Sequence, residues 1–444
     1  MSLFGSLLKK DSGDLKPGKW RVGDKIADRY EIYQVLGGEG KSGMGVVYVC
    51  YDHNNKTYLA LKTFQEKYLI KEDAKKLFER EAIIWTELEK HPNIVRAYWV
   101  QRLMDGRLFI VLEYISPDKR GRNTLTHYLR DLALPQILKF SIQFCHGMEY
   151  AYSKGVDAHR DIKTDNIMIA DDKTLKITDF GLAKAFSEIK LQEDIISPGE
   201  RTGLSIFQTK AGKRACGTLQ YMSPEQFDGY ADKRSDIYSF GAVLYQMVTS
   251  GRLPFAGRTI QEWENLHKYE KVPAVSSPLF SVIQKCLEKE QDKRYQDFKD
   301  IRIELECLLL EETGERIAIP EKAGLEAWEW DNKGAAFSNI GKYDEAISCF
   351  DKALEKDCNF DKAWCDKGIA LVALRKHDEA LSCLHKSTKI NPRYAEAYFV
   401  EGLLLFSLAR LNEALSCLDK AIKINPNLIE AQKLKQFVLQ KLRR

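Results

Sequence analysis

The sequence predicts an α+β protein, with a β-rich part before a helical part, followed by an all-α solenoid of repeated helix pairs. Three observations support this fold class. Short β-rich runs alternate with turn residues from 30 to 115, helical periodicity dominates after Thr124, and residues 327–428 repeat with a period of 34 residues. Because a chain of 444 residues is too long for one ordinary core, two or three domains are expected.

Composition and charge exclude several classes of protein. With 44% hydrophobic and 30% charged residues, the chain can bury a proper interior. The net charge of +4 is small, so we expect no nucleic-acid partner. The apolar stretch in MSLFGSLLKK is too short for a signal peptide, and no apolar run approaches the ~20 residues of a membrane helix. Ten cysteines without a CxxC pair fit reduced thiols, so we expect a cytoplasmic protein with no membrane partner.

Five β-rich runs predict a five-stranded antiparallel sheet in the first part of the chain. They read RYEIYQVL, GVVYVCYD, YLALKTF, IVRAYWVQRL and RLFIVLEYI, and turn-like text such as DHNNK and MDG separates them. One helix is expected to interrupt the sheet at residues 72–90, where Leu77, Ile84 and Leu88 recur at helical spacing among charged residues.

Helical text follows the predicted sheet, with two exceptions. The stretch PQILKFSIQFCHGMEYAYSKG predicts a helix with Pro135 in its first turn and Gly155 at its C-terminal stop. Residues 186–214 lose periodicity and fill with Ser, Thr, Gly and charge, which predicts a long loop of the kind that carries function. Residues 307–324 predict a linker.

The C-terminal part, residues 325–428, repeats itself three times. The residues that return every 34 positions are Gly334, Gly368 and Gly402, then Ala346, Ala380 and Ala414, and then Cys349, Cys383 and Cys417. A fixed 34-residue period is typical of tetratricopeptide repeats, which are helix pairs that bury their faces against neighbouring pairs. The predicted repeats span 327–360, 361–394 and 395–428, and residues 429–444 predict a capping helix.

The strongest chemical signal is a set of five motifs in a fixed order. YLALK ends at Lys62, and Glu81 follows on the predicted helix. AHRDIKTDNIM contains H-R-D-x-x-x-x-N, D-F-G begins at Asp179, and S-P-E ends at Glu225 beyond the long loop. An order and spacing of this kind are hard to produce by accident.

On these motifs, residues 29–306 resemble the eukaryotic-like (Hanks-type) serine/threonine protein kinases. The resemblance implies the bilobal protein kinase fold, with an N-lobe at 29–115, a C-lobe at 116–306 and an N-terminal extension at 1–28. It also implies that the protein transfers the γ-phosphate of ATP to Ser or Thr hydroxyls of a protein substrate, with Mg2+ as a cofactor.

The resemblance assigns catalytic and metal-binding roles by position. Asp161 matches the residue that accepts the proton of the substrate hydroxyl, and Lys163 matches the lysine that serine/threonine kinases carry two residues later. Asn166 and Asp179 match the ligands of the magnesium ions that bridge the phosphates.

A nucleotide site is implied in the same way. Lys62 is expected to neutralise the α- and β-phosphates, and Glu81 is expected to hold this lysine through an ion pair. The residues expected around the adenine are Leu36, Val47, Ala60 and Met168, with the backbone of Glu113 and Ile115 at the hinge.

The glycine cluster GGEGKSGMGVVY fits the phosphate-loop pattern G-x-G-x-x-G-x-V only loosely. If Gly40 is the first glycine of the pattern, Ser42 stands where the second glycine belongs. If Gly38 is the first glycine, Lys41 and Ser42 are an insertion. The similarity of GMGVVY to microbial members of the family favours the insertion. We expect it to loosen the cover over the phosphates and to raise the KM for ATP. The loop glycines assigned to nucleotide binding are Gly38, Gly40, Gly43 and Gly45.

Further matches predict supporting contacts and a regulated loop. The expected contacts are Thr218 with Asp161 and Lys163, Asp236 with the catalytic loop, and Arg294 with Glu225. Arg160 is expected to bind a phosphate on the long loop, as such an arginine often does in this family. The candidate acceptors are Ser187, Ser197, Thr202, Ser205 and Thr209, of which Thr202 or Thr209 is favoured as the phosphorylation site.

The repeats are expected to bind a protein or peptide partner in a groove lined by the first helix of each pair. The residues predicted to face this groove are Trp328, Asp331, Ala335, Lys362, Cys365, Ile369, Phe399, Leu403 and Phe406. Lysines and asparagines of the kind that clamp a C-terminal carboxylate are largely missing, so an apolar or mixed peptide is the expected ligand. The alternative is that the repeats only pack back on the kinase domain.

A rival hypothesis is a pseudokinase scaffold in which the repeats are the working part. Lys62, Asp161, Asn166 and Asp179 are all present, whereas scaffolds commonly lose at least one of these residues. The sequence therefore favours an active kinase.

Overall fold

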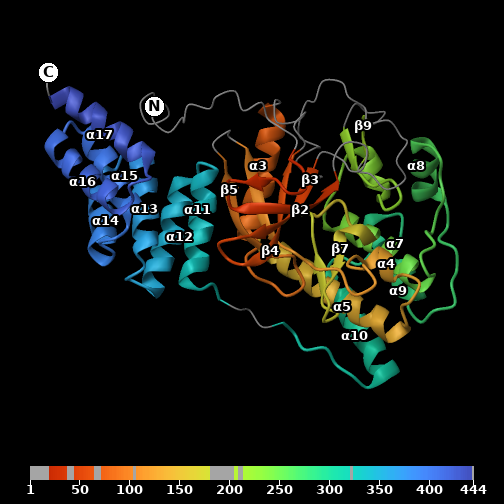
Figure 1. Ribbon diagram of the computed structural model, residues 1–444. Helices are drawn as coiled ribbons and strands as arrows, with labels where there is room; N and C mark the ends of the chain where they lie inside the picture. Colours follow the sequence, from red (N-terminus) through yellow and green to blue (C-terminus); the bar gives the residue numbers. More distant parts are fainter. Residues whose placement is uncertain are drawn as a thin grey trace. The chain divides into compact units, whose positions relative to one another are not determined.

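The computed structural model (Figure 1) describes residues 20–37, 45–64, 72–103, 107–180, 205–208, 214–320 and 324–442. This part of the chain forms two compact units. The N-terminal unit contains residues 20–97 and 110–320, and the repeat unit contains residues 324–442 and takes in the segment 98–109. Among the described residues, no helix has the length and apolar character that crossing a membrane requires.

Six strands form one sheet in the order β1-β2-β3-β4-β6-β5. They are β1 (Lys25–Ile26), β2 (Tyr30–Gly37), β3 (Gly45–Asp52), β4 (Thr57–Phe64), β5 (Ala97–Arg102) and β6 (Leu108–Glu113). The sequence predicted five of them, and the prediction was wrong about β1. A strand of two residues is too short to show an alternation of apolar and polar residues in the sequence. In the structure Ile26 is buried and β1 pairs antiparallel with β2.

Helix α3 (Glu72–Glu87) lies in the predicted place, and its buried face is only partly the predicted one, the side chain of Leu77 lying outside the described part of the chain. Phe78 and Trp85 are buried, whereas Ile84 is only half-buried; Leu88, just beyond the helix, is buried as expected. The predicted face was defined by aliphatic residues alone. The larger aromatic side chains, seven positions apart, decide which side packs inward.

The rest of the N-terminal unit is mainly helical. Its elements are α4 (Leu125–Tyr128), α5 (Leu134–Ser153), η1 (Thr164–Asn166), β7 (Ile167–Ile169), β8 (Leu175–Ile177), η2 (Pro224–Asp228), α7 (Lys233–Val248), α8 (Ile260–Tyr269), α9 (Phe280–Cys286), η3 (Gln291–Lys293) and α10 (Phe298–Thr313). Pro135 lies in the first turn of α5, and Gly155 follows its end with a φ of 88°, both as predicted.

Helix α7 is the centre of this helical lobe and is buried along nearly its whole length. The ring of Phe240 stacks on Phe144 of α5 at a centroid distance of 4.5 Å and meets Phe298 of α10 at 5.6 Å. Gly241 lets α7 approach α9 closely, because a Cβ there would lie 2.7 Å from the Cβ of Cys286.

Two segments without sequence periodicity contain regular structure. Strands β9 (Ser205–Gln208) and β10 (Arg214–Gly217) pair antiparallel at the end of the predicted loop 186–214, where four-residue strands leave no clear pattern. Helix α10 continues to Thr313 before a left-handed glycine ends it, so the start of the predicted linker 307–324 is helical.

Lys289, which follows α9, carries an ammonium group without a hydrogen-bond acceptor. Its Nζ is enclosed, has no hydrogen-bond partner among the described residues, and lies 4.6 Å from the centroid of the Phe255 ring. Burial, with a contribution from the nearby guanidinium of Arg294, lowers the pKa of Lys289 to about 8.

Replacing Lys289 by methionine is therefore expected to raise the free energy of unfolding at pH 7 by about 1 kcal/mol. The pKa of a lysine in the unfolded chain is about 10.5, so the wild-type protein takes up a proton on unfolding between about pH 8 and 10.5 and becomes more stable as the pH rises through this range. The advantage of the variant should shrink over the same range in urea titrations. A difference that is constant with pH would contradict this account, and the exposed Lys299→Met is the control for charge removal.

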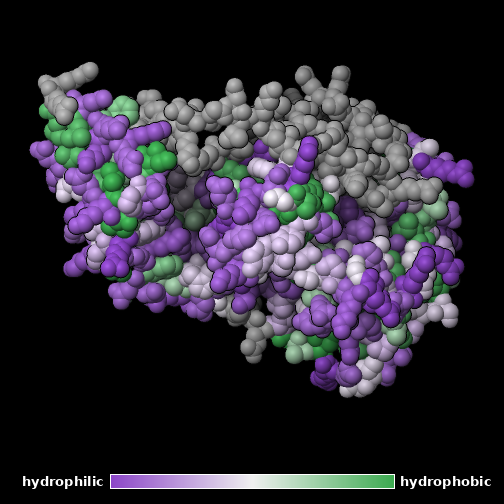
Figure 2. Space-filling view, in the orientation of Figure 1, coloured by the Kyte–Doolittle hydropathy of each residue, from purple (hydrophilic) through white to green (hydrophobic). Residues whose placement is uncertain are grey.

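The described part of the repeat unit contains seven helices after residue 324. They are α11 (Ala327–Asn339), α12 (Tyr343–Lys356), α13 (Asp361–Ala373), α14 (His377–Ile390), α15 (Ala395–Ser407), α16 (Leu411–Ile424) and α17 (Ile429–Leu442). Figure 1 shows α11 to α16 as successive helix pairs, one for each predicted repeat, with α17 after the last pair. The face seen in Figure 2 is mainly hydrophilic and carries separate hydrophobic patches.

One glycine in each repeat sets the distance between the two helices of a pair. A Cβ on Gly334 would lie 2.5 Å from the ring of Phe350 on the partner helix. At Gly368 and Gly402 the same atom would lie 2.9 and 3.0 Å from a leucine of the partner helix. Since side chains do not approach this closely, only glycine permits the packing, and this explains its return every 34 residues.

The turn within each helix pair places one residue in the left-handed backbone region. Gly341 holds this position in the first repeat with a φ of 84°, whereas Arg375 and Ala409 hold it in the others with φ of 62° and 59°. A residue with a Cβ loses roughly 1–2 kcal/mol in this conformation, and glycine does not.

We therefore expect Ala409→Gly to raise the free energy of unfolding by about 0.5–1 kcal/mol, the relief of strain being partly offset by the greater freedom of glycine in the unfolded chain. Urea unfolding followed by circular dichroism would measure this change in the free energy of unfolding. Ala414→Gly, inside helix α16, is the matched control and should lower stability instead. Equal losses in both variants would argue against strain at Ala409.

Candidate active site

The register of the sheet places the expected nucleotide-binding side chains on one face. Leu36 lies opposite Val47 in the β2–β3 pairing, and Val47 lies opposite Lys62 in the β3–β4 pairing. Residues opposite each other project to the same side of the sheet, and Ala60, two residues before Lys62 on the same strand, projects to that side as well. Leu36 is 42% exposed and Lys62 only 3%, so this face runs from an open apolar edge to a buried ammonium. Met168 lies outside this sheet and is half-buried on β7.

The segment after β6, the predicted hinge, leaves one backbone donor open. The N–H of Glu113 donates to the carbonyl of Arg96 at 2.8 Å, and the carbonyl of Ile115 accepts from Nδ2 of Asn123 at 3.0 Å. The N–H of Ile115 has no hydrogen-bond partner in the described chain. A flat heterocycle with an acceptor nitrogen fits such a donor at the end of an apolar face.

Lys62 is the centre of a buried cluster of charges. Its Nζ lies 2.6 Å from Oε1 of Glu81, the ion pair expected from the sequence, and 2.7 Å from Oδ1 of Asp179. Burial alone would lower the pKa of Lys62, but the carboxylates of Asp179 and Glu81 raise it above its ordinary value. Burial also works to raise the pKa of Asp179, yet Lys62 holds it below the ordinary value. The lysine is therefore a fixed positive charge at neutral pH.

Asp161 is held by hydrogen bonds on both carboxylate oxygens. Thr218 donates to Oδ1 at 2.7 Å, and Nζ of Lys163 lies 2.9 Å from Oδ2. Lys163 also donates to Thr218 at 3.1 Å, and Nδ2 of Asn166 donates to Oδ2 at 3.0 Å. Burial would raise the pKa of Asp161, but Lys163 and these hydrogen bonds hold it below its ordinary value. The site thus contains an ionised carboxylate that can accept a proton.

The backbone before Asp161 takes a strained conformation that Asp236 supports. Arg160 has a φ of 68°, which is unusual for a residue with a large side chain. The fully buried carboxylate of Asp236 accepts from the backbone N–H of His159 at 2.6 Å and of Arg160 at 2.8 Å. The hydroxyl of Tyr152 donates to the same carboxylate at 2.8 Å. The predicted support of this loop by Asp236 is confirmed.

Two side-chain oxygens in the site are suited to Mg2+. Asn166 uses Nδ2 to bind the carbonyl of Asp161 at 2.8 Å, and its Oδ1 has no donor in the described chain. Asp179 uses Oδ1 for Lys62, and its Oδ2 is likewise free of donors there. Mg2+ prefers such oxygen ligands and takes the remainder from water and phosphates. The described residues contain no group of three or more His, Cys, Asp or Glu that could hold a metal, so the other ligands would have to come from these sources.

Phe180 of the D-F-G motif is completely buried between two rings to which the sequence pattern assigned no role. Its centroid lies 5.8 Å from Trp85 on α3 and 4.8 Å from His159. Trp85 also donates to Oε1 of Glu81 at 3.3 Å. The spacing of four residues on one helix was a signal that could have found Trp85. No sequence pattern pointed to Tyr152.

Several predicted site residues lie outside the described chain, namely Gly38, Gly40, Gly43, Thr202 and Thr209. Gly45 is described and begins β3, where a Cβ would make only ordinary contacts.

The predicted groove of the repeat unit is only partly open. Trp328 and Ile369 are 48% and 42% exposed, and Lys362 is also accessible. The prediction was wrong for four other residues, which are buried: Asp331, Cys365, Leu403 and Phe406. Cys365 packs in one cluster with residues of the next repeat, such as Ala397 and Leu404. The family pattern does not distinguish such a covered position from an open one.

The described residues of the N-terminal unit thus combine a buried Lys–Glu–Asp cluster and an open apolar face with an ionised aspartate, a combination typical of phosphotransferases. Comparison with known proteins points to the same class. Residues 30–302 match the protein kinase domain, and residues 327–360, 361–394 and 395–428 each match a tetratricopeptide repeat. The chain belongs to the protein kinase family and carries three tetratricopeptide repeats.

Curated bacterial relatives share the first part of the chain. A probable serine/threonine-protein kinase of Streptomyces coelicolor is 31% identical over 296 residues, which cover 64% of this chain and 40% of the relative. The kinase PknB of Mycolicibacterium smegmatis is 32% identical over 291 residues, with 63% and 43% covered. The kinase PrkC of Bacillus subtilis is 30% identical over 295 residues, with 64% and 41% covered. The chain therefore spans less than half the length of these relatives.

Proposed function

We propose that the protein is an ATP-dependent serine/threonine protein kinase and that its repeats bind a protein partner or substrate. The observation that carries the proposal is Lys62, held at 2.6 Å by Glu81 and at 2.7 Å by Asp179, in the same unit as the ionised Asp161. A kinase mainly positions two partners and balances charge, and these residues meet that requirement.

In this proposal each residue has one task. The substrate would be ATP, and Mg2+ would supply positive charge to balance its phosphates. Lys62 would bind the α- and β-phosphates, while Asn166 Oδ1 and Asp179 Oδ2 would hold the metal. The N–H of Ile115 binds the base. Asp161 orients the substrate hydroxyl and accepts its proton.

The acceptor is proposed to be Ser or Thr. Lys163, which bonds to Asp161 and Thr218, is the residue on which the sequence prediction rests. The relatives named above are themselves described as serine/threonine-protein kinases, which supports the same choice. No observation favours the scaffold alternative, because Lys62, Asp161 and Asp179 are present and paired.

Regulation by phosphorylation of the long loop, at Thr202 or Thr209, is proposed as well, since Arg160 precedes Asp161. Mass spectrometry of active protein should find a phosphate on one of them; active protein without it would contradict this part. Trp328 and Ile369 would contact an apolar or mixed peptide partner of the repeats. The nine free cysteines of the described chain support a reducing compartment such as the cytoplasm.

The test is transfer of label from γ-labelled ATP to a generic basic protein in the presence of Mg2+, followed by phosphoamino acid analysis. We expect label on Ser or Thr that disappears with a chelator and in Lys62→Met. Lys56→Met, an exposed position before β4, is the matched control and should keep the activity. No transfer by the wild-type protein, or label on Tyr alone, would overturn the proposal.

A further inference from the structure

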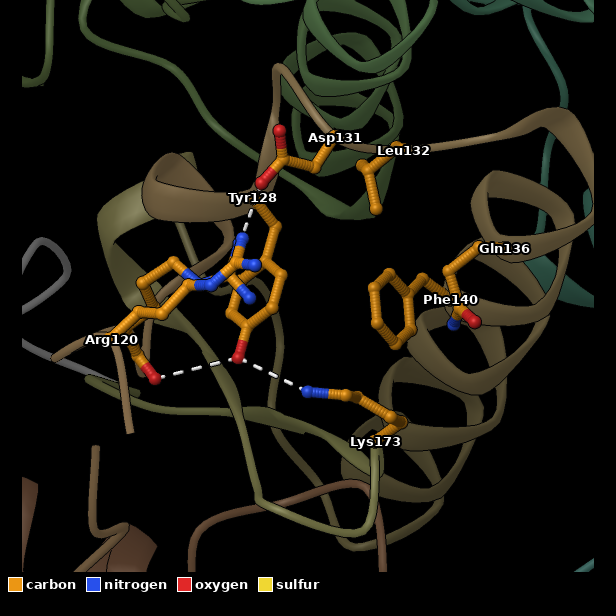
Figure 3. Close-up of a pocket in the computed structure, with 8 residues that line it drawn as sticks. Arg120, Tyr128, Asp131, Leu132, Gln136, Phe140 and Lys173 are labelled. Carbon is orange, nitrogen blue, oxygen red and sulfur yellow. Dashed lines mark hydrogen bonds and ion pairs between the residues drawn. The ribbon is translucent and has the colours of Figure 1, made fainter. Parts of the chain in front are cut away.

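A pocket of about 440 Å³ lies in the helical lobe of the N-terminal unit, and the proposed chemistry does not use it (Figure 3). Three separate segments line it: the stretch after the hinge, helices α4 and α5 with their connection, and the turn between β7 and β8. Its lining includes Arg120, Arg122, Tyr128, Asp131, Leu132, Phe140 and Lys173. We propose that this pocket docks an acidic segment of a protein substrate that also carries an apolar side chain.

The floor of the pocket is apolar. Phe140 and Tyr128 are buried, with exposures of 1% and 5%, and Leu132 is half-buried. In Figure 3 the rings of Tyr128 and Phe140 face each other across the pocket, with Leu132 above and Lys173 below. An aliphatic side chain that enters this space loses contact with water on several sides, which favours binding.

The rim of the pocket is cationic. The guanidinium of Arg122 lies 4.3 Å from the Tyr128 centroid, and Nζ of Lys173 lies 5.0 Å from it. Arg122 pairs with two carboxylates, at 3.0 Å with Asp118 and at 2.6 Å with Asp131, so these three groups together carry a net negative charge and Arg122 offers no free charge to a ligand. The tyrosine ring therefore holds two positive groups at the mouth of an apolar space.

Two cations on this rim, those of Lys173 and Arg120, are not neutralised. Nζ of Lys173 donates only to the Tyr128 hydroxyl, at 3.4 Å, and has no carboxylate partner among the described residues. Arg120 is exposed and likewise has no ion pair in that part of the chain. Lys173 is also held at the rim by its backbone, with a φ of 65° in the β7–β8 turn. The charge complementarity of the pocket therefore favours carboxylates on the ligand.

A peptide segment fits both halves of this pocket better than a small anion does. A free phosphate would use the cations and leave the apolar floor in water. A segment of acidic residues around one leucine would place carboxylates near Arg120 and Lys173 and the leucine against Phe140. Reading the ligand as a kinase substrate rests on the proposed function, but binding itself can be measured without activity.

Helix α4 connects the pocket to the catalytic loop. It carries Tyr128 into the pocket, while Thr126 Oγ1 lies 2.8 Å from Thr164 Oγ1 and 2.6 Å from Oδ1 of Asp165. A segment docked on one side of α4 is therefore held near the loop that contains Asp161. Docking of this kind raises the effective concentration of the acceptor, so it should lower the KM of a substrate that carries such a segment and leave kcat unchanged.

The test uses full-length protein and a fluorescein-labelled peptide, Glu-Glu-Leu-Glu-Leu-Glu-Glu, followed by fluorescence anisotropy. We expect saturable binding that weakens at least about tenfold in Arg120→Ala/Lys173→Ala and weakens with added salt. Lys271→Ala/Lys299→Ala, which removes two exposed cations elsewhere, should bind as the wild-type protein does. Unfolding midpoints of both double variants establish that they are folded.

Two altered peptides separate the two halves of the pocket. Replacing Glu by Gln, or Leu by Ala, should each weaken binding at least about tenfold. No saturable binding to the wild-type protein, or equal binding to Arg120→Ala/Lys173→Ala, would overturn the proposal. Unchanged affinity of the Ala peptide, together with competition by inorganic phosphate, would also overturn it and show an anion site. Because anisotropy does not depend on turnover, an inactive kinase would not affect this result.

Discussion

Replacing Asp161 by asparagine is expected to lower kcat about 10²- to 10⁴-fold and to leave the affinity for nucleotide unchanged. The carboxylate is held by Thr218, Lys163 and Asn166, and the pKa of Asp161 lies below its ordinary value, so it is ionised and oriented before the substrate arrives. Asparagine has the same shape but cannot take a proton. Its amide would also face the donors of Lys163 or Asn166, which disturbs the arrangement further.

Steady-state kinetics with a protein substrate, together with a nucleotide titration, separate the two quantities. Asp300→Asn, at an exposed position in the first turn of α10, removes the same charge away from the site and should keep full activity. A variant at Asp161 that retains more than a tenth of the wild-type kcat would show that another group accepts the proton.

The second large effect is on stability. Replacing Arg294 by methionine is expected to lower the free energy of unfolding by about 3–5 kcal/mol, because it leaves a partly buried carboxylate without its counter-ion. The side chain of Arg294 is fully buried and donates to Oε1 and Oε2 of Glu225 at 2.8 and 2.9 Å. It also donates to the carbonyls of Glu288, Lys289 and Arg234 at 2.6, 3.0 and 3.1 Å. Only a guanidinium offers this many donors in one plane.

Urea unfolding measures this loss, and two further variants test its cause. Lys293→Met removes the adjacent exposed charge and should change stability by less than about 0.5 kcal/mol. Glu225→Gln combined with Arg294→Met removes the unpaired carboxylate and should recover part of the loss. If the double variant loses as much free energy of unfolding as the two single variants together, the loss comes from packing and not from an unpaired charge.

The sequence was most informative where a pattern is long or a motif is local. Long strands and helices bury one face over several turns or pleats, so their periodicity shows in the text, as it does for α5. Strands of two or four residues, such as β1 and β9, are set by pairing with a neighbour and leave no period. The buried face of α3 was only partly predicted for a related reason, because the packing of Trp85 against Phe180 depends on a distant segment.

The active site likewise has contacts that a sequence motif predicts and contacts that only the folded structure shows. The ion pair of Lys62 with Glu81 followed from known motifs, whereas the second partner, Asp179, was assigned only to the metal. The docking pocket could not be predicted at all. It joins segments that begin at Arg120 and end at Lys173, and its charge balance depends on which arginine is already paired.

The close contact at one glycine in each repeat has a mechanical consequence. Each helix pair is fixed by its own contact, such as Gly334 on Phe350, and α17 seals only the last pair, through Leu434 and Val438. Interactions thus run from neighbour to neighbour along the array. Under tension applied at the C-terminal end, α17 should detach first and the pairs should then open one after another. The force–extension record should therefore show a small step for α17 followed by steps of one repeat each.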